Sequence, residues 1–237
     1  MNPPVPMMLY CRPTFHRQFE FLHDEVLKKG HLGWILGPPG TGKSSTAMAF
    51  ASTMNRREWI VTWIHVDKLM AWKCVHLIGD TRKTRLIDIS DVDEVLMVDD
   101  TRHHVVLVDG WTDSDAFNEL TSKCIQWFLE SNEEVRKQQL AFICSVAARG
   151  KPKESMDILT RANEFHMWSW TLDEYLHAVK NGVVYESASQ YLNAPVLLRN
   201  RVAMVESKYY YAGGSCRNMF HFNTETVATK LSDAVDA

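Results

Sequence analysis

The sequence lacks the features of membrane-spanning, disulfide-bonded and highly charged proteins. Its 237 residues contain no apolar run of the roughly 18 residues that a membrane helix needs, so we expect no membrane span. The five cysteines are odd in number and irregularly spaced, without a C-x-x-C pair, which argues against a disulfide framework. A net charge of only -3 gives no bulk indication of binding to nucleic acid or to an anionic membrane. The segment Met1–Pro13 has no basic n-region, so we expect no secretory signal peptide there.

What the sequence does contain is typical of a soluble globular protein, with 46% hydrophobic and 23% charged residues. The length suits one α/β domain of ordinary size with a small helical lid. Cys124 and Cys144 lie within apolar patterns and are predicted to be reduced thiols in the core.

Short apolar runs alternate with helical patterns over most of the chain. Candidate strands occupy residues 32–36, 59–66, 105–110, 140–146 and 165–170, with two shorter strands within 72–89. One candidate helix carries an apolar face made of Phe117, Leu120, Cys124 and Trp127. This alternation predicts a mainly parallel sheet with helices on both faces, which is a three-layer α/β/α arrangement.

The pattern changes near the end of this region. Thr171 and Glu174 have the spacing of a capping box that opens a helix, and the remaining sequence is predicted to be mostly helical. We therefore predict an extended lead-in at residues 1–13, a core at residues 14–170 and a helical lid at residues 171–237.

The most informative motif is G-x-x-x-x-G-K-[ST], which spans Gly37 to Ser44 after a predicted strand and before a predicted helix. Glycines let successive N–H groups point inward around phosphate oxygens, and the N-terminus of the next helix adds partial positive charge. We expect Lys43 to reach the β- and γ-phosphates and the Ser44 hydroxyl to bind Mg²⁺. The predicted nucleotide-binding set is completed by Pro38, Pro39, Gly40, Thr41, Gly42 and Ser45.

This loop and the α/β pattern together predict a P-loop NTPase fold of the additional-strand, AAA-like kind. The alternative is a chance match in a turn before an ordinary helix, which the full motif in this context makes much less favoured. The loop does not distinguish ATP from GTP. Because the guanine-reading string N-K-x-D is absent from the sequence, ATP with Mg²⁺ is the favoured ligand pair.

A P-loop enzyme also needs an acidic residue at the end of a strand to hold the Mg²⁺ hydration shell. Asp109 closes the apolar run 105–108, whereas Asp99 and Asp100 close the run 95–98. The run before Asp109 is more strongly β-branched, and the run before Asp99 is preceded by residues typical of a helix start. Asp109 is therefore favoured, and Ser44 and Asp109 form the predicted metal site.

The residue after Asp109 departs from the usual ATPase pattern. Many ATPases have Glu at this position to orient the attacking water, whereas this chain has Gly110. Asp113 or Glu119 could take that role, although neither lies in a recognised motif. Hydrolysis is therefore expected to be slow, or the protein to act as a nucleotide-held switch.

Two further polar residues are candidate sensors of the γ-phosphate. Ser145 ends a predicted strand, and the alternative is a serine that simply terminates it. Arg217 follows the pair Gly213 and Gly214, so it is predicted to lie in the first turn of a lid helix and to reach the γ-phosphate from there. The alternative for Arg217 is a surface arginine paired with an acid. The predicted catalytic set is Lys43, Asp109, Ser145 and Arg217.

Four segments resemble the P-loop ATPase domain of the Crinkler effectors, which is similar to the retrotransposon hot spot proteins. They are the Tyr-x-Arg element in Leu9–Pro13, the phosphate loop, the Met-x-x-Trp-Thr-x-x-Glu-like stretch in 165–174, and the Gly-Gly-x-x-Arg segment in 213–217. The resemblance covers about residues 9–220 and supports the roles of Lys43, Ser44, Asp109 and Arg217.

The resemblance implies an ATPase module of a secreted effector or a selfish-element protein that acts in a host cell or its nucleus. It implies a host nuclear protein or DNA as partner, and self-association is a further expectation; a cytoplasmic protein is the alternative. Members of that family usually also carry an N-terminal translocation region and a nuclease-like domain. This sequence has room for neither, so it looks like the ATPase module alone or a truncated relative.

Three functions compete at this point. The first is a Mg²⁺-dependent ATPase whose cycle drives a conformational change. The second is a nucleotide-binding interaction module with little or no turnover, which the glycine after Asp109 favours. The third, a small-molecule kinase, is disfavoured because residues 171–212 contain only two arginines, Arg199 and Arg201.

Overall fold

The structure is a computed structural model that describes residues 9–66, 72–98, 101–110, 115–130, 137–149, 154–192 and 200–235. The chain packs as two compact units. Unit 1 comprises Met1–Phe15, Pro38–Gly42 and Trp168–Ala237, and unit 2 comprises His16–Gly37 and Lys43–Met167. The phosphate-loop sequence therefore passes from unit 2 into unit 1 and back. The division into lead-in, core and lid that the sequence suggests remains a prediction.

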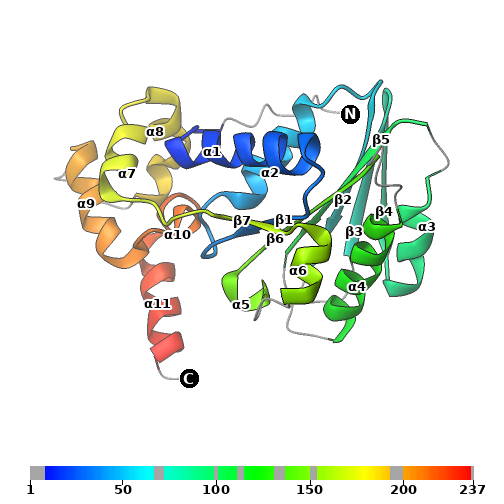
Figure 1. The fold of residues 1–237 in the computed structure, drawn as a ribbon. Helices are drawn as coiled ribbons and strands as arrows, with labels where there is room; N and C mark the ends of the chain where they lie inside the picture. Colours follow the sequence, from blue (N-terminus) through cyan, green and yellow to red (C-terminus); the bar gives the residue numbers. More distant parts are fainter. Residues whose placement is uncertain are drawn as a thin grey trace. The chain divides into compact units, whose positions relative to one another are not determined.

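Unit 2 is built on a seven-stranded sheet with the order β4-β3-β2-β5-β6-β1-β7 (Figure 1). The strands are β1 (Gly33–Leu36), β2 (Trp59–His65), β3 (Trp72–Ile78), β4 (Thr81–Ile87), β5 (His103–Asp109), β6 (Gln138–Cys144) and β7 (Asn163–His166). Five of them run parallel, whereas β3 and β4 form an antiparallel hairpin at one edge. The predicted mainly parallel sheet is confirmed.

The strand order places β6 between β1 and β5. Leu36 pairs with Cys144, and Asp109 pairs with Ile143, so these three strands end at nearly the same level. The strand that leads into the phosphate loop is thus separated from the strand that ends in Asp109 by one additional strand. In a parallel sheet the residues that follow these strands share one edge, where ligands of open α/β sheets bind.

Helices cover both faces of this sheet (Figure 1). One face packs against η1 (Leu22–Lys28), which continues α1 (Pro13–Phe21), and against α2 (Lys43–Thr53). The other packs against α3 (Val92–Leu96) and α4 (Asp115–Leu129). The described residues of unit 2 also form η2 (Ile89–Asp91), α5 (Val146–Arg149) and α6 (Glu154–Thr160). The three-layer α/β/α arrangement is therefore confirmed.

The buried side chains agree with the predicted apolar patterns. Phe117, Leu120, Cys124 and Trp127 all lie in the core on α4. Cys124 and Cys144 are free thiols, as predicted, and burial raises the pKa of each to about 12. In the part of the chain that the structure describes, no helix has the length and apolarity needed to cross a bilayer.

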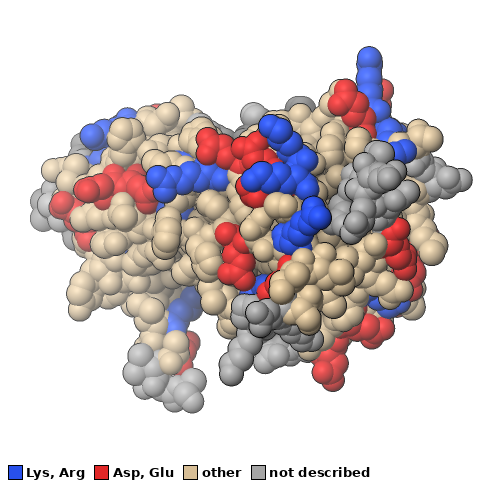
Figure 2. All heavy atoms as spheres, viewed as in Figure 1, with Lys and Arg blue, Asp and Glu red and all other residues tan. Residues whose placement is uncertain are grey.

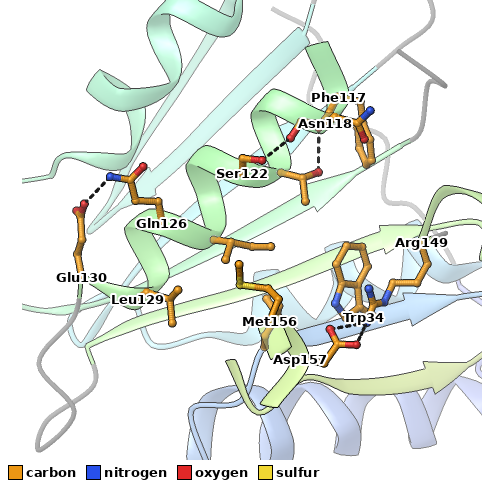
Figure 3. Close-up of a pocket in the computed structure, with 13 residues that line it drawn as sticks. Trp34, Phe117, Asn118, Ser122, Gln126, Leu129, Glu130, Arg149, Met156 and Asp157 are labelled. Atoms are coloured by element: carbon orange, nitrogen blue, oxygen red, sulfur yellow. Dashed lines mark hydrogen bonds and ion pairs between the residues drawn. The ribbon is translucent and has the colours of Figure 1, made fainter. Parts of the chain in front are cut away.

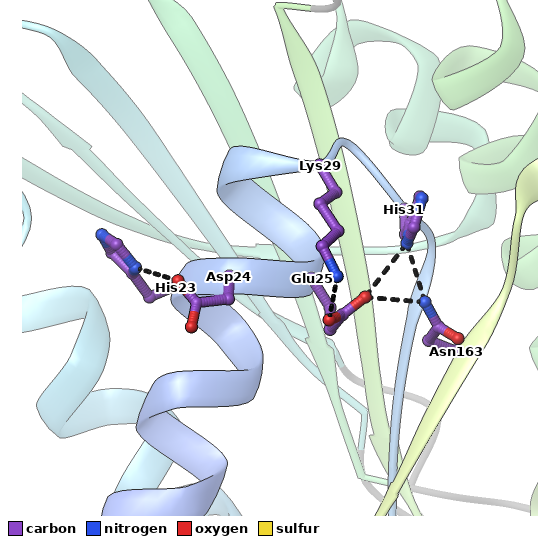
Figure 4. A network of polar contacts seen from close by, with 6 residues as sticks. All are labelled: His23, Asp24, Glu25, Lys29, His31 and Asn163. Atoms are coloured by element: carbon purple, nitrogen blue, oxygen red, sulfur yellow. Dashed lines mark hydrogen bonds and ion pairs between the residues drawn. The ribbon is translucent and has the colours of Figure 1, made fainter.

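A polar network joins the π-helix η1 to the start of β7 (Figure 4). Lys29 Nζ donates to one Glu25 oxygen at 2.6 Å, and Asn163 Nδ2 donates to the other at 3.0 Å. His31 Nδ1 lies 3.2 Å from the second oxygen. The hydrogen bond from Lys29, as the largest cause, and the contact with His31 lower the pKa of Glu25.

The C-terminal part of unit 1 is helical over its described residues. It contains α7 (Leu172–Ala178), α8 (Gly182–Ala188), η4 (Ser189–Tyr191), α9 (Arg201–Ala212), α10 (Cys216–Phe220) and α11 (Thr224–Val235). The predicted capping box of Thr171 and Glu174 opens α7. Trp170, Tyr175, Val205 and Met219 form the centre of its apolar core.

A buried lysine lies in this unit. Lys208 is 2% exposed, and its Nζ donates to the carbonyl oxygens of Tyr191 at 2.6 Å and Phe222 at 2.5 Å. Burial lowers the pKa of Lys208 to about 8, because desolvation disfavours the charged form. Lys208 thus ties η4 and the residues after α10 to α9.

Candidate nucleotide-binding site

The phosphate loop lies where the sequence predicts it, because β1 ends at Leu36 and α2 begins at Lys43. Within unit 2, Lys43 Nζ donates to the carbonyl oxygen of Gly37 at 2.7 Å, so the side chain folds back toward the start of the loop. The fully buried Gln18 donates from Nε2 to the carbonyl oxygen of Lys43 at 2.9 Å. No sequence pattern indicates this contact from α1.

The two predicted metal ligands meet in unit 2. The Ser44 hydroxyl donates to Asp109 Oδ1 at 2.6 Å, although 65 positions separate them in the sequence. Hydroxyl and carboxylate oxygens are the hard ligands that Mg²⁺ takes, usually with several waters retained. Among the described residues no group of three His, Cys, Asp or Glu side chains gathers around a common point. Ser44 and Asp109 each bring one side-chain oxygen to this contact. The donor set therefore fits Mg²⁺.

The other Asp109 oxygen has a partner that sequence reasoning missed. His65 Nδ1 lies 3.1 Å from Asp109 Oδ2, and Asp109 itself is 4% exposed. The two residues are paired as the last residues of the parallel strands β2 and β5. The sequence does show that His65 is a polar residue at the end of a candidate strand. Only the strand order shows that this strand lies beside the one that ends in Asp109.

Position 110 has no space for a side chain. Gly110 has φ +103, and a Cβ placed on it would lie 2.1 Å from the carbonyl oxygen of Val66. The same peptide region is fixed by the bond from Val66 N to the Asp109 carbonyl at 2.7 Å. A glutamate at this position is therefore sterically excluded, and any group that orients water must come from elsewhere.

The alternative acidic residues, Asp99 and Asp100, depend on a strand over residues 95–98 that is not formed. Residues 92–96 form α3, so the alternative strand over 95–98 is wrong, and the helix-start composition before it is the correct indication. Asp99 and Asp100 lie outside the described residues, as does Asp113. Glu119 is exposed on α4.

Ser145 follows β6 directly, between the ends of β1 and β5 in the sheet order. The strand predicted over 140–146 thus ends two residues early, because Val146 begins α5. Similarly, the strand predicted over 165–170 ends at His166 as β7. The γ-phosphate role of Ser145 remains a prediction.

The middle of the phosphate loop lies in unit 1. Gly40 and Gly42 have φ of +79 and +102, which L side chains rarely adopt. The Thr41 hydroxyl donates to the Pro38 carbonyl at 3.0 Å, and Cys216 N donates to the Gly40 carbonyl at 2.9 Å. No described atom lies within 4 Å of a Cβ placed on Gly42, so this turn is open on that side.

Arg217 lies beside this part of the loop. Ser215 caps α10 by accepting from Asn218 N at 3.4 Å, and Arg217 is exposed in the first turn of that helix, as predicted. A Cβ placed on Gly40 would lie 3.4 Å from the Arg217 Cβ. Whether the guanidinium reads a γ-phosphate stays a prediction.

Two further residues of unit 1 contact Thr41, and a third contacts one of these two. Arg12 donates to the Thr41 carbonyl oxygen, Trp170 Nε1 does the same, and Glu174 pairs with Arg12. All three belong to the short elements that carry the sequence resemblance, but that resemblance assigned them no role.

A separate pocket of about 840 Å³ lies in unit 2 between α4, β1 and α6 (Figure 3). Trp34 lines it, with the Arg149 guanidinium 4.4 Å from the indole centre and bound to both oxygens of Asp157. None of the predicted site residues lines this pocket.

Comparison with solved structures finds likeness of fold at low sequence identity. Drosophila ORC bound to DNA matches with a TM-score of 0.51 and 14% identity, over 100% of this chain and 59% of that one. Cdc6p from Pyrobaculum aerophilum matches with a TM-score of 0.49 and 14% identity, over 90% and 63% of the two chains. A point mutant of RuvB from Thermotoga maritima gives 0.43 and 15%, over 92% and 67%.

The chain thus spans about three fifths of the length of the first two matched chains. No protein-family model matches the sequence, and no curated protein matches it significantly. The fold is established by the match to the ORC chain together with the strand order and the loop. The chain has a P-loop NTPase fold of the additional-strand, AAA-like kind, with a helical C-terminal part.

Proposed function

We propose that this protein binds ATP and Mg²⁺ through the phosphate loop and hydrolyses ATP slowly. The contact that carries this proposal is the 2.6 Å hydrogen bond between Ser44 and Asp109. It brings together the two side chains that the loop motif and the strand pattern independently nominate as metal ligands. If the loop motif were a chance match, no buried carboxylate would be expected within hydrogen-bond distance of its serine.

Each residue has a distinct task in this proposal. The backbone N–H groups of Gly40 to Lys43 bind phosphate oxygens, and the Lys43 ammonium balances charge on the β- and γ-phosphates. Ser44 and Asp109 hold Mg²⁺, which neutralises charge on the phosphate oxygens when it is bound. His65 orients the Asp109 carboxylate through its second oxygen.

The turnover is proposed to be slow because of Gly110. An adjacent glutamate is the usual residue that orients the attacking water, and the backbone here leaves no room for its side chain. Ser145 and Arg217 are proposed to contact the γ-phosphate, which would make the protein sensitive to ATP rather than ADP. The same observation favours a second candidate, a nucleotide-binding interaction module with little or no turnover.

The biological setting is proposed from the short motifs alone. They support a Crinkler-like effector or a selfish-element protein that acts in a host cell or its nucleus, with a cytoplasmic protein as the alternative. The ORC structure is bound to DNA, and DNA or a host nuclear protein is a proposed partner here, as is a second copy of the chain. Acidic and basic side chains lie next to one another on the face shown in Figure 2, in keeping with the net charge of -3.

Steady-state phosphate release from the pure protein tests this proposal. Release from ATP should be slow but measurable, and Ser44→Ala and Asp109→Asn should each remove it. Glu206→Gln, an exposed position on α9 to which no role in the site is assigned, is the matched acidic control. Tight ATP binding without release would favour the interaction module, and equal release from wild type and Asp109→Asn would refute the ATPase.

A further inference from the structure

We propose that Arg12 is a positioning residue that fixes the backbone of the phosphate loop from outside the nucleotide site. The inference rests on the proposed function, because it concerns how that site acquires its shape. Arg12 precedes α1, 25 positions before the loop begins at Gly37. Nothing in the loop motif itself points to it.

The Arg12 side chain is almost fully buried, with 3% exposed. Its Nη2 donates to the carbonyl oxygens of Thr41 at 3.1 Å and Trp168 at 2.5 Å. Its Nη1 donates to Glu174 Oε2 at 3.1 Å. The guanidinium also lies 5.0 Å from the centre of the Trp170 ring. One side chain therefore links the N-terminal segment, the phosphate loop and the start of α7.

Two successive carbonyl groups of the loop are held in this way. Thr41 O accepts from Arg12 and, at 3.3 Å, from Trp170 Nε1, and the preceding Gly40 O accepts from Cys216 N at 2.9 Å. A peptide group is planar, so fixing a carbonyl also fixes the direction of the N–H on its other side. The N–H groups that follow Gly40 and Thr41 are those of Thr41 and Gly42, inside the phosphate-binding motif.

The loop needs this external support because its own sequence is permissive. Glycine permits many backbone conformations, and the loop places Gly40 and Gly42 at positive φ. A loop that must order on binding loses affinity. Arginine suits the supporting role because its rigid fork can donate to several acceptors at once. Glu174 compensates the buried charge and is itself fixed, since it also accepts from Thr171 N at 3.0 Å.

This arrangement predicts a specific nucleotide dependence. The phosphate loop binds the β-phosphate, which ATP and ADP share, so a disordered loop should weaken both ligands. Loss of a γ-phosphate contact, such as the one proposed for Arg217, should weaken ATP alone. A role limited to global stability should change neither affinity at temperatures where the variant is folded.

The experiment measures the Kd for Mg²⁺-ADP and for Mg²⁺ with a non-hydrolysable ATP analogue by calorimetry, with folding checked by circular dichroism. Arg12→Lys keeps the charge but loses the fork, and Trp170→Phe keeps the ring but loses the donor to Thr41. Arg149→Ala is the control, since Arg149 is also a largely buried arginine that pairs with acids and lies over a tryptophan.

We expect Arg12→Lys to weaken both nucleotides by roughly ten- to a hundredfold and Trp170→Phe by about three- to tenfold, while Arg149→Ala retains wild-type affinity. Wild-type affinity in folded Arg12→Lys would overturn the inference. A loss confined to the ATP analogue, or an equal loss in Arg149→Ala, would also overturn it. Failure of the wild type to bind either nucleotide would instead refute the proposed function.

Discussion

Replacing Gly40 with alanine should damage the phosphate loop more than the same change at Gly42. Both glycines have positive φ, so an added Cβ strains the backbone at each position. They differ in their surroundings, because a Cβ on Gly40 would lie 2.2 Å from Ser215 Oγ and 3.2 Å from Ser215 Cβ. A Cβ on Gly42 would meet no described atom within 4 Å.

The magnitudes follow from this difference. Backbone strain alone costs about 1–2 kcal/mol, which is the expected loss of unfolding free energy for Gly42→Ala. Gly40→Ala adds an overlap with a short side chain that cannot rotate out of the way at its Cβ. Overpacking of this kind typically costs a further ~1–3 kcal/mol. We therefore expect a total loss of roughly 2–5 kcal/mol for Gly40→Ala.

Urea unfolding of wild type and both variants measures the difference, and a double variant identifies its cause. Ser215→Gly removes the colliding side chain, and glycine costs only a few tenths of a kcal/mol at an N-cap such as this one. Gly40→Ala with Ser215→Gly should therefore approach the stability of Gly42→Ala. Equal losses for the two single variants, or no recovery in the double variant, would refute the packing argument.

Three further predictions concern charged residues. Asp109→Asn should lower Mg²⁺-dependent phosphate release far more than Asp99→Asn, and the opposite ranking would show that the acidic residue is misassigned. Arg217→Ala should weaken ATP binding by about ten- to a hundredfold and leave ADP binding nearly unchanged, as titration of both nucleotides will show. The pKa of Lys208 falls from its usual 10.5 to about 8 on folding, so the buried charge destabilises the protein below pH 8. Unfolding free energy should therefore rise by at most ~3 kcal/mol between pH 8 and 10.5, and this rise should be absent in Lys208→Met.

The sequence predicts the parts of this protein that depend on local patterns. The run that ends at Asp109 is continuous and β-branched, as expected of a strand buried on both faces, and β5 is indeed a central strand. The phosphate loop is recognised by spacing alone. The capping box at Thr171 likewise depends on two side chains that are three positions apart.

The contacts that the sequence could not reveal are long-range. His65 reaches Asp109 only because β2 and β5 are neighbours in the sheet, and Arg12 reaches Thr41 only through the fold of unit 1. The predicted end of a strand was also wrong where the strand is followed by a helix with no Gly or Pro between them. The apolar Val146 prolongs the pattern of β6 although it begins α5.

The lack of space for a side chain at position 110 is a further property that the sequence does not reveal. The sequence indicates that the usual glutamate is missing, but only the backbone shows that position 110 could not accept it. The absence of glutamate at position 110 is therefore a steric requirement of this backbone. A group that orients the attacking water has to come from another element.

Calorimetric titration of Mg²⁺-ATP into wild type, Lys43→Ala and Lys28→Ala tests the central claim most directly. Lys28 is an exposed lysine at the end of η1 and serves as the matched control. The account predicts saturable binding to wild type and Lys28→Ala and its loss in a folded Lys43→Ala. Wild-type ATP affinity in Lys43→Ala would contradict it.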